Sequence, residues 1–333
     1  MGLEKDFLCE DAGRATSPGT SAMTPSLFGS YELLDKVADG NLSELWLARP
    51  REGKGVAREV LIKRVISHVS GHPEHLALFR QEAKLSAHLR HPNIAGFYEF
   101  GEVQGAHYIA REFVHGQPLD AVLRQAQRKP SVISHALALR IGASICEGLH
   151  HAHTRVDHLG RPLGLVHREL AARHILISFD GGVKLIGFGG LLIGEYQNQK
   201  RGGFVMLSFD SMAPEQLAGT EQDPRTDVFA AALAIYELLT GVHPLRRDSN
   251  LETVEATREC KISPPSQVAH VPSVLDSVVM RALAREKEDR YSDAREFQLA
   301  LEGCLLAHRW QVGAAELSAM MRALFPTSTP QRE

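Results

Sequence analysis

Histidines and cysteines are the side chains that most often bind metals or act as nucleophiles, and this chain has 17 histidines and four cysteines. Four of the histidines gather near the end of a predicted helix, at His150, His151, His153 and His158. Such a cluster suits a transition metal, but we favour packing and surface roles. The cysteines form no CxxC pair and are widely spaced, at Cys9, Cys146, Cys260 and Cys304. This spacing indicates neither a disulfide framework nor a zinc site, so we expect reduced thiols.

The elements that would position functional residues change type along the chain. Strand-like β-branched and apolar patterns occupy Tyr31–Pro50, Ala57–Ser67 and His107–Val114. Apolar residues at helical spacing follow in Pro73–Leu89, Ala136–Ala152 and Arg225–Thr240. The turn Asp180-Gly181-Gly182 predicts a hairpin between two short strands. Strands first and helices later predict an α+β fold with two unequal lobes.

The composition is ordinary for a globular protein, with 44% hydrophobic and 23% charged residues. The net charge of −3 gives no overall attraction to nucleic acid or to an anionic membrane. The most apolar stretch, Val228 to Tyr236, is too short to span a bilayer and predicts a buried helix. We therefore expect a cytoplasmic protein with no membrane segment and no nucleic-acid partner.

Several short motifs occur in a characteristic order. They are Val60-Leu61-Ile62-Lys63, then Glu82, Val166-His167-Arg168-Glu169-Leu170, Gly187-Phe188-Gly189, Ala213-Pro214-Glu215, Asp227-Val228-Phe229 and finally Arg290. Over roughly Tyr31 to Leu305 this series resembles the protein kinase family. It is most similar to bacterial Ser/Thr kinases, in particular a myxobacterial group with similar stretches around His91-Pro92-Asn93-Ile94 and Gly160-Arg161-Pro162-Leu163.

The resemblance implies a two-lobed kinase fold, with a small, mainly β N-lobe carrying one key helix and a larger, mainly α C-lobe. We expect a disordered tail over residues 1–29 and a kinase-like domain over 30–305, with the N-lobe at 30–112 and the C-lobe at 116–305. Residues 306–333 then form a C-terminal helix and tail. The helix, Ala314–Phe325, has an apolar stripe that serves either to dock on the large lobe or to bind a partner.

In this family a lysine holds the nucleotide phosphates, an Asp and an Asn bind magnesium, and a catalytic-loop Asp accepts the substrate proton. The two metal positions are changed here to Gly187 and His174. Glycine has no side-chain oxygen for magnesium, and a neutral imidazole is a poor ligand for it. Glu169 stands at the proton-acceptor position and is one methylene longer than Asp. These three changes together predict a catalytically dead or severely impaired site, with no metal bound by its side chains.

The nucleotide-binding positions are kept in part. The resemblance assigns that role to Lys63, Glu82, Gly40, Glu112 and Val114. Gly40 is the one glycine left of the phosphate-binding loop, where glycines allow the backbone to approach phosphates closely. ATP without magnesium is therefore the only cofactor left open.

Arg111 occupies the gatekeeper position of the adenine pocket, and Leu61 replaces a smaller residue beneath the base. A buried arginine needs a partner. From its position we predict that Arg111 pairs with Glu82 and competes for it with Lys63.

The positions that support the fold match the kinase motifs better than the positions that carry out the reaction. The resemblance assigns structural roles to His167, Arg168, Phe188, Glu215, Asp227 and Arg290. Among them, Asp227 would hydrogen-bond the catalytic-loop backbone, and Glu215 would form a buried ion pair with Arg290. In the activation segment, Tyr196, Ser208 and Ser211 are candidate phosphorylation sites, with an unmodified loop as the alternative.

The sequence therefore predicts a pseudokinase that acts as a regulatory scaffold or allosteric partner in bacterial Ser/Thr phosphorylation signalling. Its partners would be other signalling proteins, such as an active kinase or a phosphatase. One alternative is an active or weakly active Ser/Thr kinase with unusual metal ligands, Glu169 among them. Another is a nucleotide sensor that binds ATP through Lys63 without a metal.

Overall fold

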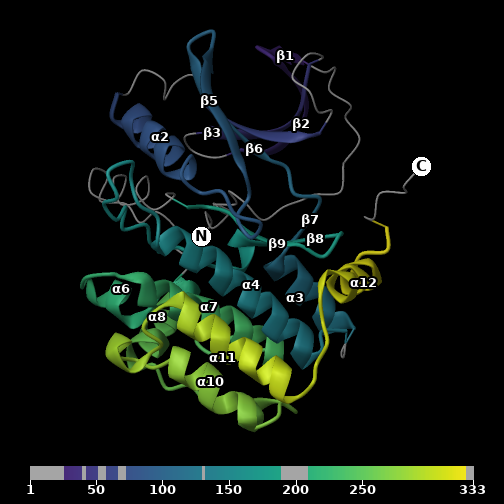
Figure 1. Cartoon of the computed structure of the whole chain (residues 1–333), viewed down its shortest axis with the longest axis vertical. Helices are drawn as coiled ribbons and strands as arrows, with labels where there is room; N and C mark the ends of the chain where they lie inside the picture. Colours follow the sequence, from purple (N-terminus) through teal and green to yellow (C-terminus); the bar gives the residue numbers. More distant parts are fainter. Residues whose placement is uncertain are drawn as a thin grey trace, which may run out of the picture. The chain divides into compact units, whose positions relative to one another are not determined.

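The computed structural model describes residues 26–39, 43–51, 58–66, 73–129, 132–188 and 209–327. These residues divide into two compact units. The first contains the described residues up to 87 and those from 96 to 113, and the second contains 88–95 and 114 onward. A small β-rich unit and a larger helical unit are the α+β architecture that the sequence predicts (Figure 1).

The first unit is a six-stranded antiparallel sheet with one helix. The strand order is β1-β2-β3-β4-β6-β5. The strands are β1 (Ser26–Phe28), β2 (Tyr31–Asp39), β3 (Ser43–Pro50), β4 (Val60–Val65), β5 (Phe97–Val103) and β6 (Ala106–Glu112), and the helix is α2 (Pro73–Ser86). Strand β1 pairs with β2, although the sequence placed residues 26–29 in the tail. The short apolar segment ending at Phe28 gains its strand conformation from this pairing, because Phe28 becomes buried.

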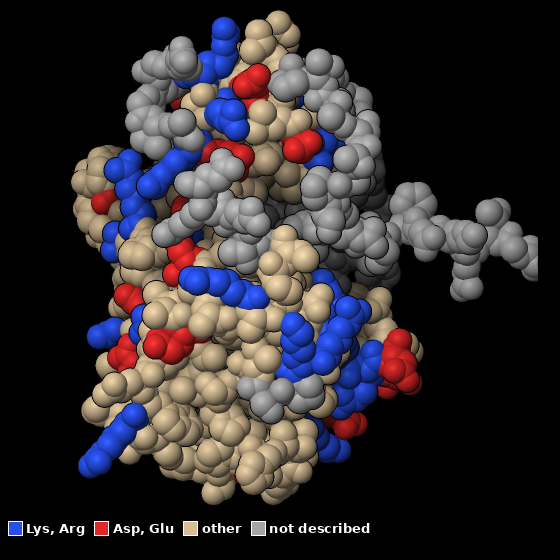
Figure 2. Space-filling view, turned by 90° about the vertical axis from the view of Figure 1, so that its right-hand side faces the viewer, with Lys and Arg blue, Asp and Glu red and all other residues tan. Residues whose placement is uncertain are grey.

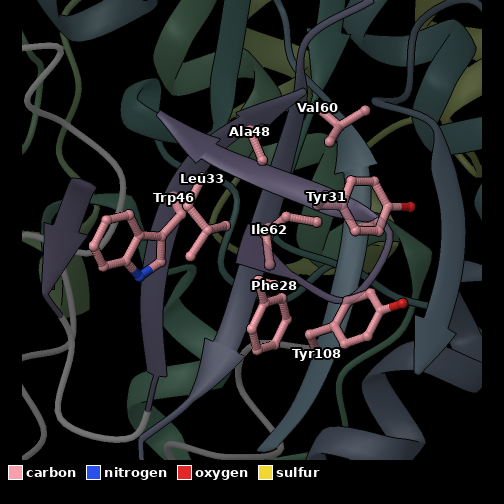
Figure 3. Packing of buried hydrophobic residues seen from close by; sticks show 9 residues of the cluster. Phe28, Tyr31, Leu33, Trp46, Ala48, Val60, Ile62 and Tyr108 are labelled. Atoms are coloured by element: carbon pink, nitrogen blue, oxygen red, sulfur yellow. The ribbon is translucent and has the colours of Figure 1, made fainter. Parts of the chain in front are cut away.

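Alternation along the strands sends side chains to two different layers. On one face Val60, Ile62, Tyr108 and Ala110 join a core with Phe28, Tyr31, Leu33, Trp46 and Ala48 (Figure 3). On the other face Val65 and Ile109 pack against Phe79 and Ala83 of α2. Lys63 follows Ile62 on β4, and Arg111 follows Ala110 on β6. The side chains of Lys63 and Arg111 therefore lie on the opposite face of the sheet, the one that packs against α2.

The second unit is mainly helical. Its longer helices are α3 (Leu119–Arg128), α4 (His135–His153), α7 (Pro224–Thr240), α8 (Asn250–Glu259), α10 (Val274–Ala282), α11 (Ala294–Ala307) and α12 (Ala314–Leu324). Shorter helices are α6 (Pro214–Ala218) and α9 (Pro265–Val268), with 3-10 turns η1 (Ala172–His174), η2 (Phe209–Ser211) and η3 (Lys287–Asp289). Helix α4 packs against α7 and α11. Nearly every residue of α7 is buried, as its apolar sequence predicts.

A small sheet, β7-β8-β9, lies in the second unit. Strands β8 (Ile175–Ser178) and β9 (Val183–Leu185) form the predicted hairpin, and β7 (Gly116–Pro118) pairs with β8. The expected N-lobe, 30–112, includes residues 88–95, which instead group with this unit. The reason is pairing with β9: Leu185 donates its N–H to the Asn93 carbonyl at 2.8 Å and accepts from the Ala95 N–H at 2.9 Å.

Within the described residues, no helix is both long and apolar enough to cross a bilayer. On the face shown in Figure 2, acidic and basic side chains both occur, and a broad area carries no Lys, Arg, Asp or Glu. The expected tail up to residue 25 and the end of the chain from residue 328 lie outside the described residues.

Candidate functional site

In the first unit, two cations converge on one buried carboxylate. Lys63 Nζ lies 3.0 Å from Glu82 Oε2 and 3.3 Å from Oε1. The Arg111 guanidinium donates to Glu82 Oε1, so the predicted pairing of Arg111 with Glu82 is confirmed. Burial raises the pKa of Glu82, but the positive charges of Lys63 and Arg111 outweigh it and lower that pKa below its usual value. Glu82 is therefore ionised and shared by both cations.

The other expected nucleotide-binding residues are less closely grouped. Glu112 ends β6, and its side chain accepts the Gly96 N–H at 2.9 Å. Val114 belongs to the second unit, so it is not part of the cluster around Glu82. Gly40 lies outside the described residues.

In the second unit, the residue at the proton-acceptor position is engaged by a cation. Arg173 Nη2 lies 3.4 Å from Glu169 Oε1, and both side chains are about three-quarters buried. Arg173 was not predicted as a site residue. Arg173 lies in the turn η1, four residues after Glu169, and this spacing brings the two side chains together. The spacing was the signal in the sequence that could have identified Arg173.

His174 and Gly187 lie against each other. The His174 Nδ1–H donates to the Glu169 carbonyl at 2.5 Å, since a carbonyl only accepts. Burial, and then the charge of Arg173, hold the pKa of His174 well below its ordinary value, so the imidazole is neutral. Gly187 has a φ of +92°, and a Cβ there would lie 3.3 Å from His174 Cδ2. The imidazole thus borders the space that a side chain at 187 would enter.

These positions do not fit a hard cation. Magnesium prefers several oxygen ligands in octahedral geometry. Gly187 has no side-chain ligand, and His174 has its Nδ1–H committed to a backbone carbonyl. Across the described residues, no group of three or more His, Cys, Asp or Glu side chains is arranged to hold a metal ion.

The predicted histidine cluster is divided among separate contacts. His153 Nε2 lies 2.8 Å from Asp227 Oδ2, whereas the His151 ring packs 4.8 Å from that of His91. His158 is exposed in a turn beyond the helix. The packing and surface roles that we favoured match these contacts.

The catalytic-loop backbone is held by one buried aspartate. Asp227 accepts the N–H of His167 at 2.7 Å and that of Arg168 at 2.8 Å. These bonds support Arg168 at a φ of +66°, a left-handed conformation that is unusual for a non-glycine residue. His167 also contacts the buried Phe188 ring, with centroids 4.6 Å apart. The loop backbone at His167 and Arg168 is therefore fixed by buried contacts.

Glu215 and Arg290 form the expected buried ion pair. Their two hydrogen bonds are both 2.8 Å, and Thr226 donates a third to Glu215 at 2.9 Å. Burial raises the pKa of Glu215, but the hydrogen bond and charge of Arg290 lower it below the usual value. Removing one member of such a pair typically costs about 3–5 kcal/mol of stability. The pair holds the start of α6, to which Glu215 belongs. Of the candidate phosphorylation sites, Tyr196 and Ser208 lie outside the described residues.

A cavity of about 320 Å³ lies within the second unit, between α3, η1, η2 and α7. Arg246 bridges two carboxylates on its wall, with Nε 2.8 Å from Asp210 and Nη1 3.1 Å from Glu237. Arg173 also lines it. Sequence reasoning missed this cavity, because its lining residues come from segments more than 100 positions apart in the chain.

Comparison with known proteins agrees with this architecture. The chain matches the family model described as "Protein kinase domain" over residues 31–307. It is 35% identical over 316 residues to "Tyrosine-protein kinase MasK" of Myxococcus xanthus, a match covering 94% of this chain and 49% of MasK. It is 31% identical over 283 residues to "Serine/threonine-protein kinase PknB" of Mycobacterium leprae, covering 83% of this chain and 43% of PknB.

A solved structure is similar throughout its length. A crystal structure of a variant of the Mycobacterium tuberculosis PknI kinase domain aligns with a TM-score of 0.61 and 25% identity. The alignment covers 85% of this chain and 99% of that one. The chain spans about half, or less, of the length of the curated relatives named above.

Proposed function

Because the chain belongs to the protein kinase family, we propose that it is a pseudokinase, acting by binding other signalling proteins rather than by transferring phosphate. The observation that carries the proposal is the pair Gly187 and His174. The first has no side chain, and the second is a buried, neutral imidazole bonded to the Glu169 carbonyl. Neither supplies the oxygen ligands with which kinases bind magnesium.

The state of Glu169 also supports this proposal. Its carboxylate is paired with Arg173 rather than presented alone to a substrate hydroxyl. A substrate hydroxyl would therefore meet a carboxylate whose Oε1 already contacts Arg173.

The residues that stabilise the fold of the second unit are present, as a protein that acts by binding would require. Asp227 holds the catalytic-loop backbone, and the Glu215–Arg290 pair holds the start of α6, to which Glu215 belongs. We propose a regulatory scaffold or allosteric partner in bacterial phosphorylation signalling, with an active kinase or a phosphatase as partner. The similar proteins are named both as tyrosine and as serine/threonine kinases, so the proposal leaves the hydroxyl class of the partner open.

We place the proposed activity in the cytoplasm. Cys146, Cys260 and Cys304 are free thiols, and two of them are buried. Reducing compartments keep thiols in this state.

A second candidate is a nucleotide sensor that works without a metal. Lys63 and Arg111 bring two positive charges to the single negative charge of Glu82. The surplus charge favours an anionic phosphate chain where a kinase would use magnesium. Lys63, whose side chain is 24% exposed, is the more accessible of the two cations.

The deciding experiment measures ATP binding by calorimetry in magnesium and in EDTA, together with phosphate transfer from radiolabelled ATP. We expect no gain in affinity from magnesium or manganese, and no transfer. Binding that is equal in EDTA and is lost in Lys63→Met would favour the sensor. Metal-dependent transfer that is abolished in Lys63→Met would instead establish an active kinase.

A further inference from the structure

Helix α2 is joined to the sheet of the first unit by two strands, each carrying a cation. Lys63 lies on β4 and Arg111 on the neighbouring β6, and both alternate with residues of the opposite core. Their side chains therefore lie on the face that receives Phe79 and Ala83 of α2. Glu82 follows Phe79 by three positions, which places it on the same face of the helix.

Burial makes the charge of Glu82 costly unless it is compensated. Its side chain is 3% exposed, and those of Lys63 and Arg111 are 24% and 17% exposed. Removing the only cation beside a buried carboxylate leaves its charge uncompensated and strongly destabilises the folded protein. Glu82 has two cations, so loss of either leaves the other in place.

The two cations are not equivalent. Arg111 presents a planar guanidinium that is always charged, and it is the less exposed of the two. Lys63 has a flexible ammonium, which also lies 5.9 Å from the centre of the Phe79 ring. Arg111 therefore suits a fixed structural contact, and Lys63 keeps more freedom to contact another group.

We infer that Arg111 is a second anchor for α2, which makes the docked position of the helix independent of Lys63. In an arrangement with one cation, loss of the lysine would release the helix. Here the contact between Arg111 and Glu82 keeps the helix on the sheet whether or not Lys63 is occupied by an anion. Arg111 is thus a positioning residue, and the inference does not depend on whether the protein transfers phosphate.

The test compares Lys63→Met, Arg111→Met, the double variant and Arg111→Lys. Hydrogen exchange of the α2 amides reports the docking of the helix, and circular dichroism checks that each variant is folded. We expect each single methionine variant to exchange within about threefold of the parent, because one cation still compensates Glu82. The double variant should exchange at least about tenfold faster, which is more than the product of the single effects.

A conservative substitution and a remote substitution complete the design. Arg111→Lys in the Lys63→Met background should restore slow exchange, because it returns a cation to Glu82. Arg124→Met, a surface substitution in the second unit, should leave α2 unchanged. Exchange as fast in Lys63→Met as in the double variant would overturn the inference, as would purely multiplicative effects. All measurements are made without nucleotide, so they stand apart from the test of the proposed function.

Discussion

The ring of His174 and the missing side chain of Gly187 complement each other at the scale of single residues. A Cβ at 187 would lie 3.3 Å from His174 Cδ2, which is tighter than most Cβ contacts, and 3.5 Å from Cγ, which is an ordinary contact distance. The left-handed φ of +92° also favours glycine. A side chain at 187 therefore requires the His174 ring to shift by a few tenths of an ångström, which a smaller residue at 174 would make unnecessary.

This fit predicts how the metal site can be restored. Aspartate tolerates a left-handed φ better than most residues, and asparagine at 174 is smaller than histidine and supplies an amide oxygen. We expect Gly187→Asp with His174→Asn to bind ATP at least about tenfold more tightly in magnesium than in EDTA, a difference of about 1.4 kcal/mol. Calorimetry checks this.

The matched control carries Gly187→Ala with His174→Asn, which adds the Cβ without the carboxylate. It should show no response to magnesium. A folded Asp–Asn variant that also shows none would mean that the missing ligands are not what prevents metal binding.

At the scale of elements, α12 is part of the second unit rather than a free helix. Its apolar stripe, Leu317, Met320, Met321 and Leu324, is buried. Ser318 donates to the Phe179 carbonyl at 2.5 Å, and Lys129 donates to the Ala323 carbonyl at 2.6 Å. Of the two roles considered for this helix, the structure supports docking, because the stripe that a partner would need is already covered.

Docking of α12 depends on a glycine in the β8–β9 turn. Gly181 has a φ of +90°, and a Cβ there would lie 1.9 Å from the Ala314 carbonyl oxygen at the start of the helix. We therefore expect Gly181→Ala to displace α12, seen as faster hydrogen exchange of its amides and earlier cleavage by protease.

Gly160→Ala is the control for backbone strain alone. Gly160 has a similar φ of +77°, but nothing lies within 4 Å of an added Cβ. This variant should lose some stability from its φ without loosening α12. Equal effects of the two substitutions on α12 would argue against the steric explanation.

At the scale of the whole molecule, stability depends on ionised carboxylates in both units. Burial raises the pKa of Glu44, but hydrogen bonds from Lys36, Arg64 and Trp46 hold it at about 2. Asp223 is held at about 2 in the same way, with Arg225 as its main partner. The pKa of the buried Asp227 is also lowered, against the effect of burial, by His153 and by the backbone of the catalytic loop.

A folded-state pKa below the unfolded value contributes stability above the unfolded pKa and loses it as the pH falls. We therefore expect the urea midpoint to fall already below about pH 6.5, because unfolded histidines bind protons that the buried His174 and His243 do not, and to fall further between about pH 4.5 and 2, the window set by Glu44. Glu44→Gln should make this fall shallower. A midpoint that does not change down to pH 3 would contradict the assignment.

Much of the fold follows from local sequence patterns. Alternation in β4 and β6, the Asp180-Gly181-Gly182 turn and the apolar run of α7 each specify an element through near neighbours. The boundaries of the two units do not follow from such local patterns. Residues 88–95 join the second unit through backbone bonds to β9, and no local pattern encodes a partner about 90 positions away.

The sequence by itself determined which atoms are missing. Glycine at 187 and histidine at 174 cannot supply a side-chain carboxylate or amide oxygen in any fold, so this property follows from residue type without coordinates. It also placed Arg111 correctly opposite Glu82, because strand and helix positions follow from motif order.

Only the tertiary structure decided which partners the other charged and apolar side chains contact. The pairing of Glu169 with Arg173 and the covering of the α12 stripe are contacts in space. Each depends on distances of a few ångströms between side chains, which chain order alone leaves undetermined, because burial and packing set them only after the chain has folded.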